Sequence, residues 1–187
     1  MRSGADADLV VVHIDAHTDT YRGDGNQDYM RFNVATTFTR AAEEALIDVE
    51  SSIHVGARGP TNDSGVFSHT RDVGYGLIDG TELFNNGLRN TAKKIINTLE
   101  GRSVYLCFDM DFFDPSCAPG VCTPTWGGAT SREGLEFLQS LAGLNIVGGD
   151  INTASPPHDC SRITAFLAAT VGLEILSLIC HSKKLNQ

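Results

Sequence analysis

The 187-residue sequence is short of positive charge, of cysteine pairs and of an apolar N-terminal run. Its 14 Lys and Arg against 23 Asp and Glu give a net charge of −9, which repels phosphate backbones and anionic lipids, so neither nucleic acid nor a membrane is an expected partner. Five cysteines without a CxxC pair argue against a disulfide framework or zinc finger. No signal peptide is recognisable, and no stretch is expected to span a membrane. We therefore expect a cytoplasmic location.

What the sequence does contain is an alternation of β-branched runs and helical patterns. Strands are expected near residues 9–15, 52–55, 75–78, 103–108 and 145–148, and helices near 36–47, 83–99, 130–141 and 161–179. This alternation predicts an α/β fold, with three layers (α/β/α) around a mainly parallel sheet. No linker or repeat divides the chain, so residues 1–187 are expected to form a single domain.

The first apolar run, residues 9–12, has the continuous β-branched character of a strand that is buried on both faces. Such a strand is expected in the middle of the sheet. Because it begins so early in the chain, the sequence also predicts that the N-terminal part of the sheet is missing.

Two acidic motifs directly follow predicted strands. In His13-Ile14-Asp15-Ala16-His17-Thr18-Asp19, the side chains of Asp15, His17 and Asp19 alternate and can converge if the chain stays extended. Asp109 and Asp111 have the same spacing in the second motif. Because ligands of open α/β sheets bind at the carboxyl ends of strands, we expect both motifs to face one pocket.

Four carboxylates and one imidazole in a cleft need compensating positive charge. A mixed carboxylate and histidine set favours Mn²⁺ or a similar divalent ion, and bridging carboxylates would hold two ions about 3.5–4 Å apart. Either motif alone would also fit a turn or a helix cap. His13 is expected to be a hydrogen-bonded core histidine, and Asp114 to form a turn or to support the site.

The two motifs resemble the signature motifs of the ureohydrolases, the arginase and agmatinase family. The likeness continues, in the style of agmatinase and proclavaminate amidinohydrolase, through Thr123-Pro124, Gly127-Gly128, Ser131-Arg132-Glu133 and Ser155-Pro156-Pro157. The resemblance implies an arginase-like fold and a hydrolase that releases urea and an amine from a linear guanidino compound. It also implies a role in polyamine biosynthesis for an agmatinase, and a homo-oligomer if the full-length chain is present.

The resemblance further implies a two-manganese centre whose bridging hydroxide attacks the guanidinium carbon. The first metal would be held by Asp15, Asp19 and Asp109. The second would be held by Asp15, His17, Asp109 and Asp111. Asp19 would be the catalytic residue, because it also steadies the hydroxide.

The sequence departs from the family pattern at three places. The family carries a further metal-ligating histidine in an upstream Gly-Gly-Asp-His stretch that this sequence lacks, so one ion is expected to be weakly held. Val34 stands where relatives have a proton-shuttling histidine, and Thr153 stands where they have a glutamate that meets the guanidinium. His158 could partly replace the lost acid or be a surface histidine without a role, and Trp126 could form a wall of the pocket or serve in packing. The alternative hypothesis is a catalytically impaired fragment or pseudoenzyme that acts as a metal-binding or oligomer-forming subunit.

Overall fold

Five strands of the computed structural model form one sheet; the structure describes residues 8–23 and 28–185. In sheet order, the strands are β3 (Gly76–Ile78), β2 (Ile53–Val55), β1 (Leu9–Ile14), β4 (Ser103–Asp109) and β5 (Asn145–Asn152). Each neighbouring pair is parallel. The first strand therefore lies in the middle of the sheet, as its continuous apolar run predicts.

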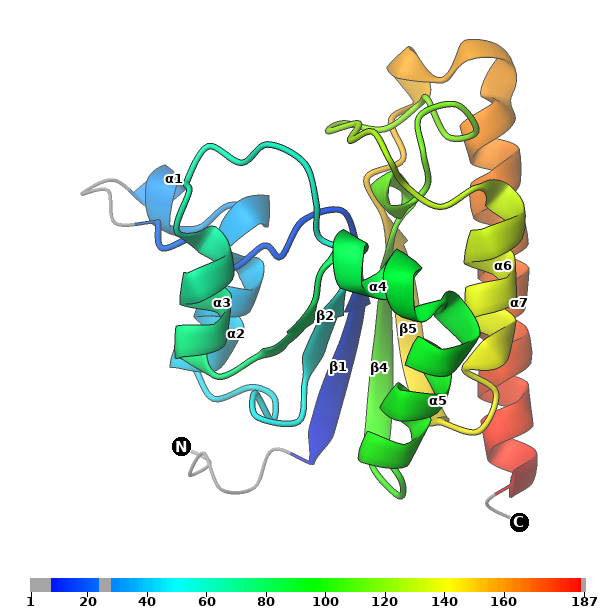
Figure 1. Cartoon of the computed structure of the whole chain (residues 1–187), viewed down its shortest axis with the longest axis horizontal. Coiled ribbons are helices and arrows are strands. Elements are labelled where there is room, and N and C mark those ends of the chain that lie inside the picture. Colours follow the sequence, from blue (N-terminus) through cyan, green and yellow to red (C-terminus); the bar gives the residue numbers. More distant parts are fainter. Residues whose placement is uncertain (1–7, 24–27, 186–187) are drawn as a thin grey trace.

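Helices cover the sheet from both sides, which confirms the predicted α/β class (Figure 1). One side carries α2 (Thr37–Glu43) and α3 (Val66–Val73), with the short α1 (Asp28–Arg31) beside them. The other side carries α4 (Gly80–Asn86), α5 (Leu88–Thr98), α6 (Ser131–Ser140) and α7 (Ile163–Leu185). Short 3₁₀ turns occur at Val34–Thr36, Met110–Phe112, Pro156–His158 and Cys160–Arg162.

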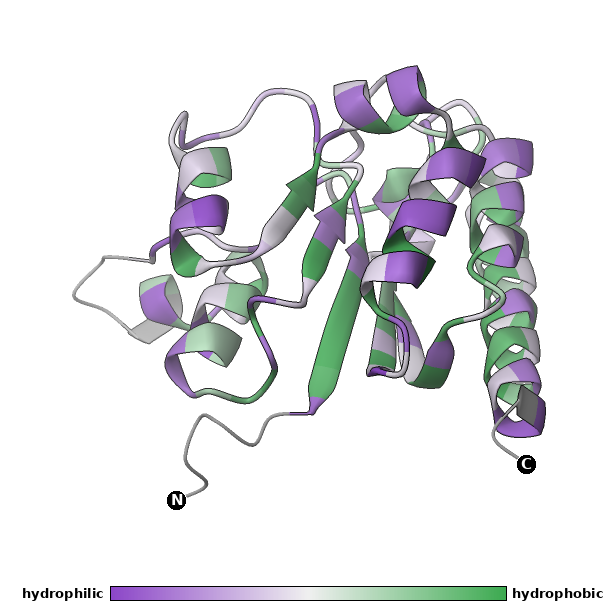
Figure 2. Ribbon diagram, turned by 60° about the horizontal axis from the view of Figure 1, so that its bottom comes forward, coloured by the Kyte–Doolittle hydropathy of each residue, from purple (hydrophilic) through white to green (hydrophobic). Residues whose placement is uncertain are grey.

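Strand β1 is apolar up to its hydrophilic carboxyl end (Figure 2), and its two faces pack into different clusters. Val10, Val12 and Ile14 point into the larger core, which they share with residues of α4 to α7. Val11 packs with Phe38 of α2 in a smaller cluster. Because strand side chains alternate, the residues that follow Val11 at period two, His13 and Asp15, lie on the α2 side.

Several element boundaries differ from the prediction for identifiable reasons. The helix expected over 36–47 ends at Glu43, and Ala45 then adopts a left-handed φ of 51°. The helix expected over 83–99 is divided at Gly87, whose φ of 79° is not helical. The capping box at the start of α6 is confirmed, since Glu133 accepts a hydrogen bond from the Thr130 N–H and donates its own N–H to Thr130 Oγ1.

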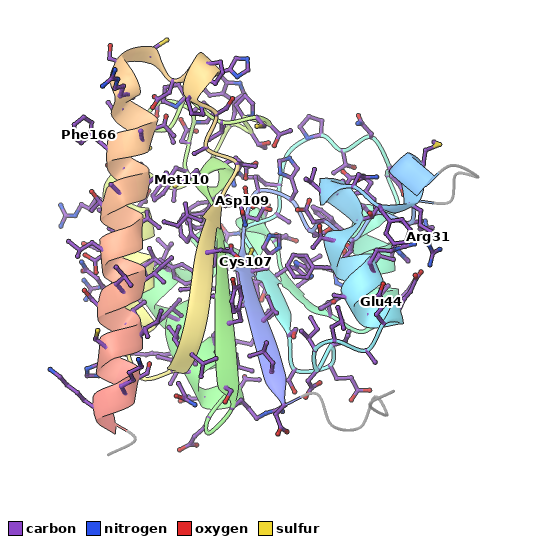
Figure 3. All side chains as sticks on the ribbon, turned by 180° about the vertical axis from the view of Figure 1, so that it is seen from behind. Arg31, Glu44, Cys107, Asp109, Met110 and Phe166 are labelled. Carbon is purple, nitrogen blue, oxygen red and sulfur yellow. The ribbon has the colours of Figure 1, made fainter. Side chains whose placement is uncertain are left out.

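Helix α7 corrects the expectation that no stretch could span a membrane. Among the described residues, Cys160–Lys184 is long and apolar enough by length and composition alone, criteria that core helices of soluble proteins also meet. Val171 and Ile175 pack this helix into the core beside β5, as predicted for a sheet-covering helix. Phe166 and Leu173 are 74% and 65% exposed on its outer side, where Figure 3 shows Phe166 pointing away from the strands. The helix is therefore apolar on a packed face and on an open one.

Candidate metal centre

The carboxyl ends of β1 and β4 bring the two acidic motifs together. The two strands are parallel neighbours, and their register pairs Ile14 with Phe108. Asp15 and Asp109 are the next residues along each strand, and Asp109 lies at the end of β4 (Figure 3). The expectation that the two segments face one place is confirmed.

The first motif turns sharply as it leaves β1. The His17 N–H donates to Asp15 Oδ1 at 2.7 Å, so the Asp15 side chain itself forms the turn. Asp19 has a left-handed φ of 49°, a conformation that costs a non-glycine residue about 1–2 kcal/mol. The motif thus converges by turning, whereas the sequence predicted convergence of an extended chain.

The side chains gather in two groups whose donor atoms lie within 4.8 Å of one another inside each group. One group consists of His13, Asp15, Asp19 and Asp109, and the other of Asp15, His17 and Asp111. Asp15 belongs to both, whereas Asp109, which the resemblance implies at both ions, belongs to the first group alone. All five predicted metal-binding residues are therefore brought together, and His13, which is buried and hydrogen-bonded as expected, also joins the first group.

Burial and mutual repulsion shift the acid–base behaviour of these groups. Burial, reinforced by the charge of Asp15, raises the carboxyl pKa of Asp19 and of Asp109 to about 7. Burial alone would lower the pKa of His17, but hydrogen bonds to Asp111 and Asp15 raise it to about 10. These directions describe a pocket that favours added positive charge.

The donor set fits divalent cations. Asp109 Oδ1 is buried and has no hydrogen-bond partner among the described residues, which is a costly state for a carboxylate oxygen. Carboxylate oxygens with one or two imidazole nitrogens suit Mn²⁺ and similar ions, and a residue shared by two groups can bridge two ions. The residues present therefore fit a pair of divalent ions.

Two residues support the site in ways that the sequence did not predict. Thr123 Oγ1 donates to Asp111 Oδ2 at 2.9 Å and fixes that carboxylate. Arg58, which follows β2, donates from Nη2 to the backbone oxygens of Asp111 and Thr125, both at 2.8 Å. The role of Arg58 cannot be predicted from local sequence, because its hydrogen-bond partners lie in distant segments.

A cleft of about 1440 Å³ opens over the metal groups. Trp126, Val34 and Thr153 line it. The hydroxyl of Thr153 is buried without a hydrogen-bond partner among the described atoms, and Val34 is 81% exposed. His158 is not among the lining residues; its Nδ1 lies 2.7 Å from Ser155 Oγ.

Comparison with known proteins places this fold and site in one family. The model of the Arginase family matches residues 1–177, and the chain belongs to that family. It is 38% identical over 176 residues to an agmatinase of Photorhabdus laumondii, covering 94% of this chain and 53% of that protein. An agmatinase of Neisseria meningitidis is 36% identical over 170 residues, covering 91% and 51% respectively.

Solved structures give the same result. A hypothetical agmatinase from Burkholderia thailandensis matches with a TM-score of 0.81 and 34% identity, over 96% of this chain and 53% of that one. Proclavaminate amidinohydrolase from Streptomyces clavuligerus matches with a TM-score of 0.84 and 35% identity, over 93% and 57%. The arginase-like fold is therefore confirmed, and the chain spans about half the length of these relatives.

Proposed function

We propose that this chain carries the centre of a metal-dependent hydrolase that cleaves a linear guanidino compound into urea and an amine. The observation that carries the proposal is the pair of donor groups that share Asp15 at the floor of a large cleft. The similarity to agmatinases supports agmatine as the first substrate to test. A cytoplasmic location, a homo-oligomer and a role in polyamine biosynthesis belong to the same proposal.

In this proposal Mn²⁺ occupies both groups. Asp15, Asp19 and Asp109 would hold one ion, and Asp15, His17 and Asp111 the other. When bound, the two ions would supply the Lewis acidity that makes water nucleophilic at neutral pH.

The chain's own residues would position the reactants. Asp19 leaves the strand in a left-handed turn that aims its carboxylate into the first group, where it would orient the attacking water. Thr123 and the N–H of Ala16 hold the two oxygens of Asp111, at 2.9 and 3.2 Å. Trp126, 75% exposed on the cleft, would form a wall against the substrate chain.

The second candidate is a catalytically impaired relative that binds metal or assembles with other subunits. Val34 and Thr153 favour it, because both line the cleft and neither can exchange a proton with the substrate or neutralise a guanidinium. This candidate predicts metal binding without turnover.

Urea release separates the two candidates. The Mn²⁺-loaded chain would be incubated with agmatine, guanidinobutyrate, guanidinopropionate and a proclavaminate-type substrate, beside Asp111→Asn, which keeps the shape of the carboxylate and removes its charge. The hydrolase proposal expects urea from at least one compound and a loss of at least about 100-fold in the variant. Metal binding with no urea from any compound would reject the hydrolase and support the second candidate.

A further inference from the structure

His13 lies deeper in the site than its position in a buried strand suggests. The side chain is 1% exposed and lies on the same face of β1 as Asp15. Its Nε2 is 3.0 Å from Asp15 Oδ2 and 4.0 Å from Asp109 Oδ2. A histidine nitrogen therefore faces two of the three carboxylates of the first group.

We propose that His13 Nε2 is a ligand of the first ion, beside the three carboxylates of the first group. The inference rests on the metal centre of the proposed function and adds a residue to it. The other members of the first group among the described residues are Asp15, Asp19 and Asp109.

The distances are short enough for His13 and the three carboxylates to bind one ion together. The candidate ligand atoms of His13, Asp15, Asp19 and Asp109 all lie within 4.8 Å of one another. Within this group, His13 Nε2 is 3.0 Å from Asp15 Oδ2 and 4.0 Å from Asp109 Oδ2. The unpartnered, buried Oδ1 of Asp109 is a second sign that the first group has room for an additional charge.

The second nitrogen of His13 also has a hydrogen-bond partner, the imidazole of His54. His13 Nδ1 lies 2.8 Å from His54 Nδ1, so a proton on His13 Nδ1 can be donated to His54. That tautomer leaves a lone pair on His13 Nε2, directed at the carboxylates. The Phe38 ring packs 4.5 Å from the imidazole of His13 and fixes its orientation.

The opposite tautomer defines the competing account. There, His13 Nε2–H donates to Asp15, and His13 only positions that ligand. The two accounts differ in whether a His13 nitrogen is bonded to the ion, a difference that magnetic resonance detects directly.

Pulsed EPR of the Mn²⁺-loaded, unaltered chain tests the proposal without changing His13. Directly bonded ¹⁴N couples to the Mn²⁺ electron spin, and the proposal expects two coupled imidazole nitrogens per chain, from His13 and His17. His17→Asn should remove one coupling and keep the other. A single coupling in the unaltered chain, or none after His17→Asn, would overturn the proposal.

Metal content gives the second test. His13→Gln should weaken one of the two ions at least tenfold in a Mn²⁺ titration. His69→Gln serves as the control, because it removes a partly buried histidine of α3 that belongs to neither donor group, and it should retain both ions. If His13→Gln binds both ions as tightly as the unaltered chain, His13 is not a ligand.

These outcomes are distinct from failure of the proposed function. Two nitrogen couplings without urea release would retain the ligand and reject the hydrolase. Urea release with a single nitrogen coupling would support the hydrolase and reject His13 as a ligand. A chain that binds no Mn²⁺ would reject both.

Discussion

The backbone N–H of Ala16 donates a hydrogen bond to Asp111 Oδ1 at 3.2 Å, although 95 positions separate the two residues. This bond joins the loop that follows β1 to the loop that follows β4. The second oxygen of Asp111 is held by Thr123. The metal centre is thus assembled by the packing of two parallel strands and is stabilised by hydrogen bonds between their loops.

Thr123→Val tests the support of Asp111. The change removes the hydroxyl that donates to Oδ2 and leaves the shape of the side chain nearly intact. Residues that orient a metal ligand typically change metal affinity by 10–100-fold, so we expect Mn²⁺ to bind about tenfold more weakly. Thr98→Val, on the exposed surface of α5, is the control and should leave the affinity unchanged. Equal affinity of both variants in a Mn²⁺ titration would contradict this role of Thr123.

Arg58→Gln tests the link between the second motif and the loop that follows it. The guanidinium donates to the backbone oxygens of Asp111 and Thr125, and its loss would leave partly buried carbonyl groups without partners. We expect the free energy of unfolding to fall by about 2–4 kcal/mol. Arg132→Gln breaks an exposed ion pair with Glu136 and should change it by less than about 1 kcal/mol. Denaturant unfolding measures both, and similar losses would count against the role of Arg58.

The metal-free chain should lose stability as the pH rises from about 4 to about 7. The carboxyl pKa of Asp19 and of Asp109 is about 7 in the fold, mainly through burial, against about 3.9 in an unfolded chain. Between about pH 4 and pH 7 the folded state therefore binds more protons than the unfolded state. The stability that these two protonated carboxyls contribute is lost as the pH rises across that window. Thermal unfolding with a chelator present measures the effect.

Two variants test whether the buried carboxylates cause this decline in stability. Asp19→Asn should flatten the decline, whereas Asp72→Asn, which changes an exposed side chain, should not. Saturating Mn²⁺ should abolish the decline, because the ions replace the protons. A metal-free chain that gains stability from pH 4 to pH 7 would show that the fold does not raise the carboxyl pKa of Asp19 and Asp109.

Gly134→Ala tests the packing of α6 against the loop of the second motif. A Cβ at Gly134 would collide with the buried ring of Phe113, so we expect a loss of about 1–3 kcal/mol in the free energy of unfolding. In α7, a Cβ at Gly172 meets only the tip of Ile151 at 3.3 Å, and Gly172→Ala should gain up to about 1 kcal/mol from helix propensity. A higher free energy of unfolding in both variants would show that the Phe113 ring can move aside at little cost.

The sequence predicted the parts of the site that depend on local pattern. Strand β1 was recognisable from its apolar run, and so was the position of both acidic motifs at the carboxyl ends of strands, the edge where ligands of open α/β sheets bind. That β1 and β4 are neighbours is a finding of the structure. The left-handed turn at Asp19 was not predictable, since a non-glycine residue adopts it only when tertiary contacts compensate for its cost.

The contacts of Arg58 and His13 could not be predicted from local sequence patterns, because they join segments that are distant in the sequence. Arg58 reaches Asp111 and Thr125, and this meeting of three segments exists only in the folded chain. His13 was predicted to be a core histidine, which its burial confirms, but its distance to Asp109 depends on the register between β1 and β4. The composition of α7 likewise does not show which of its apolar side chains are exposed, because that depends on which face packs against the rest of the fold.

The most direct test of the account is the Mn²⁺ content of the chain after loading and removal of excess ion, measured by elemental analysis at known protein concentration. Two ions per chain are predicted for the unaltered protein, and at most one for Asp15→Asn, because Asp15 belongs to both donor groups. One ion or none in the unaltered chain would contradict a complete two-metal centre within these residues.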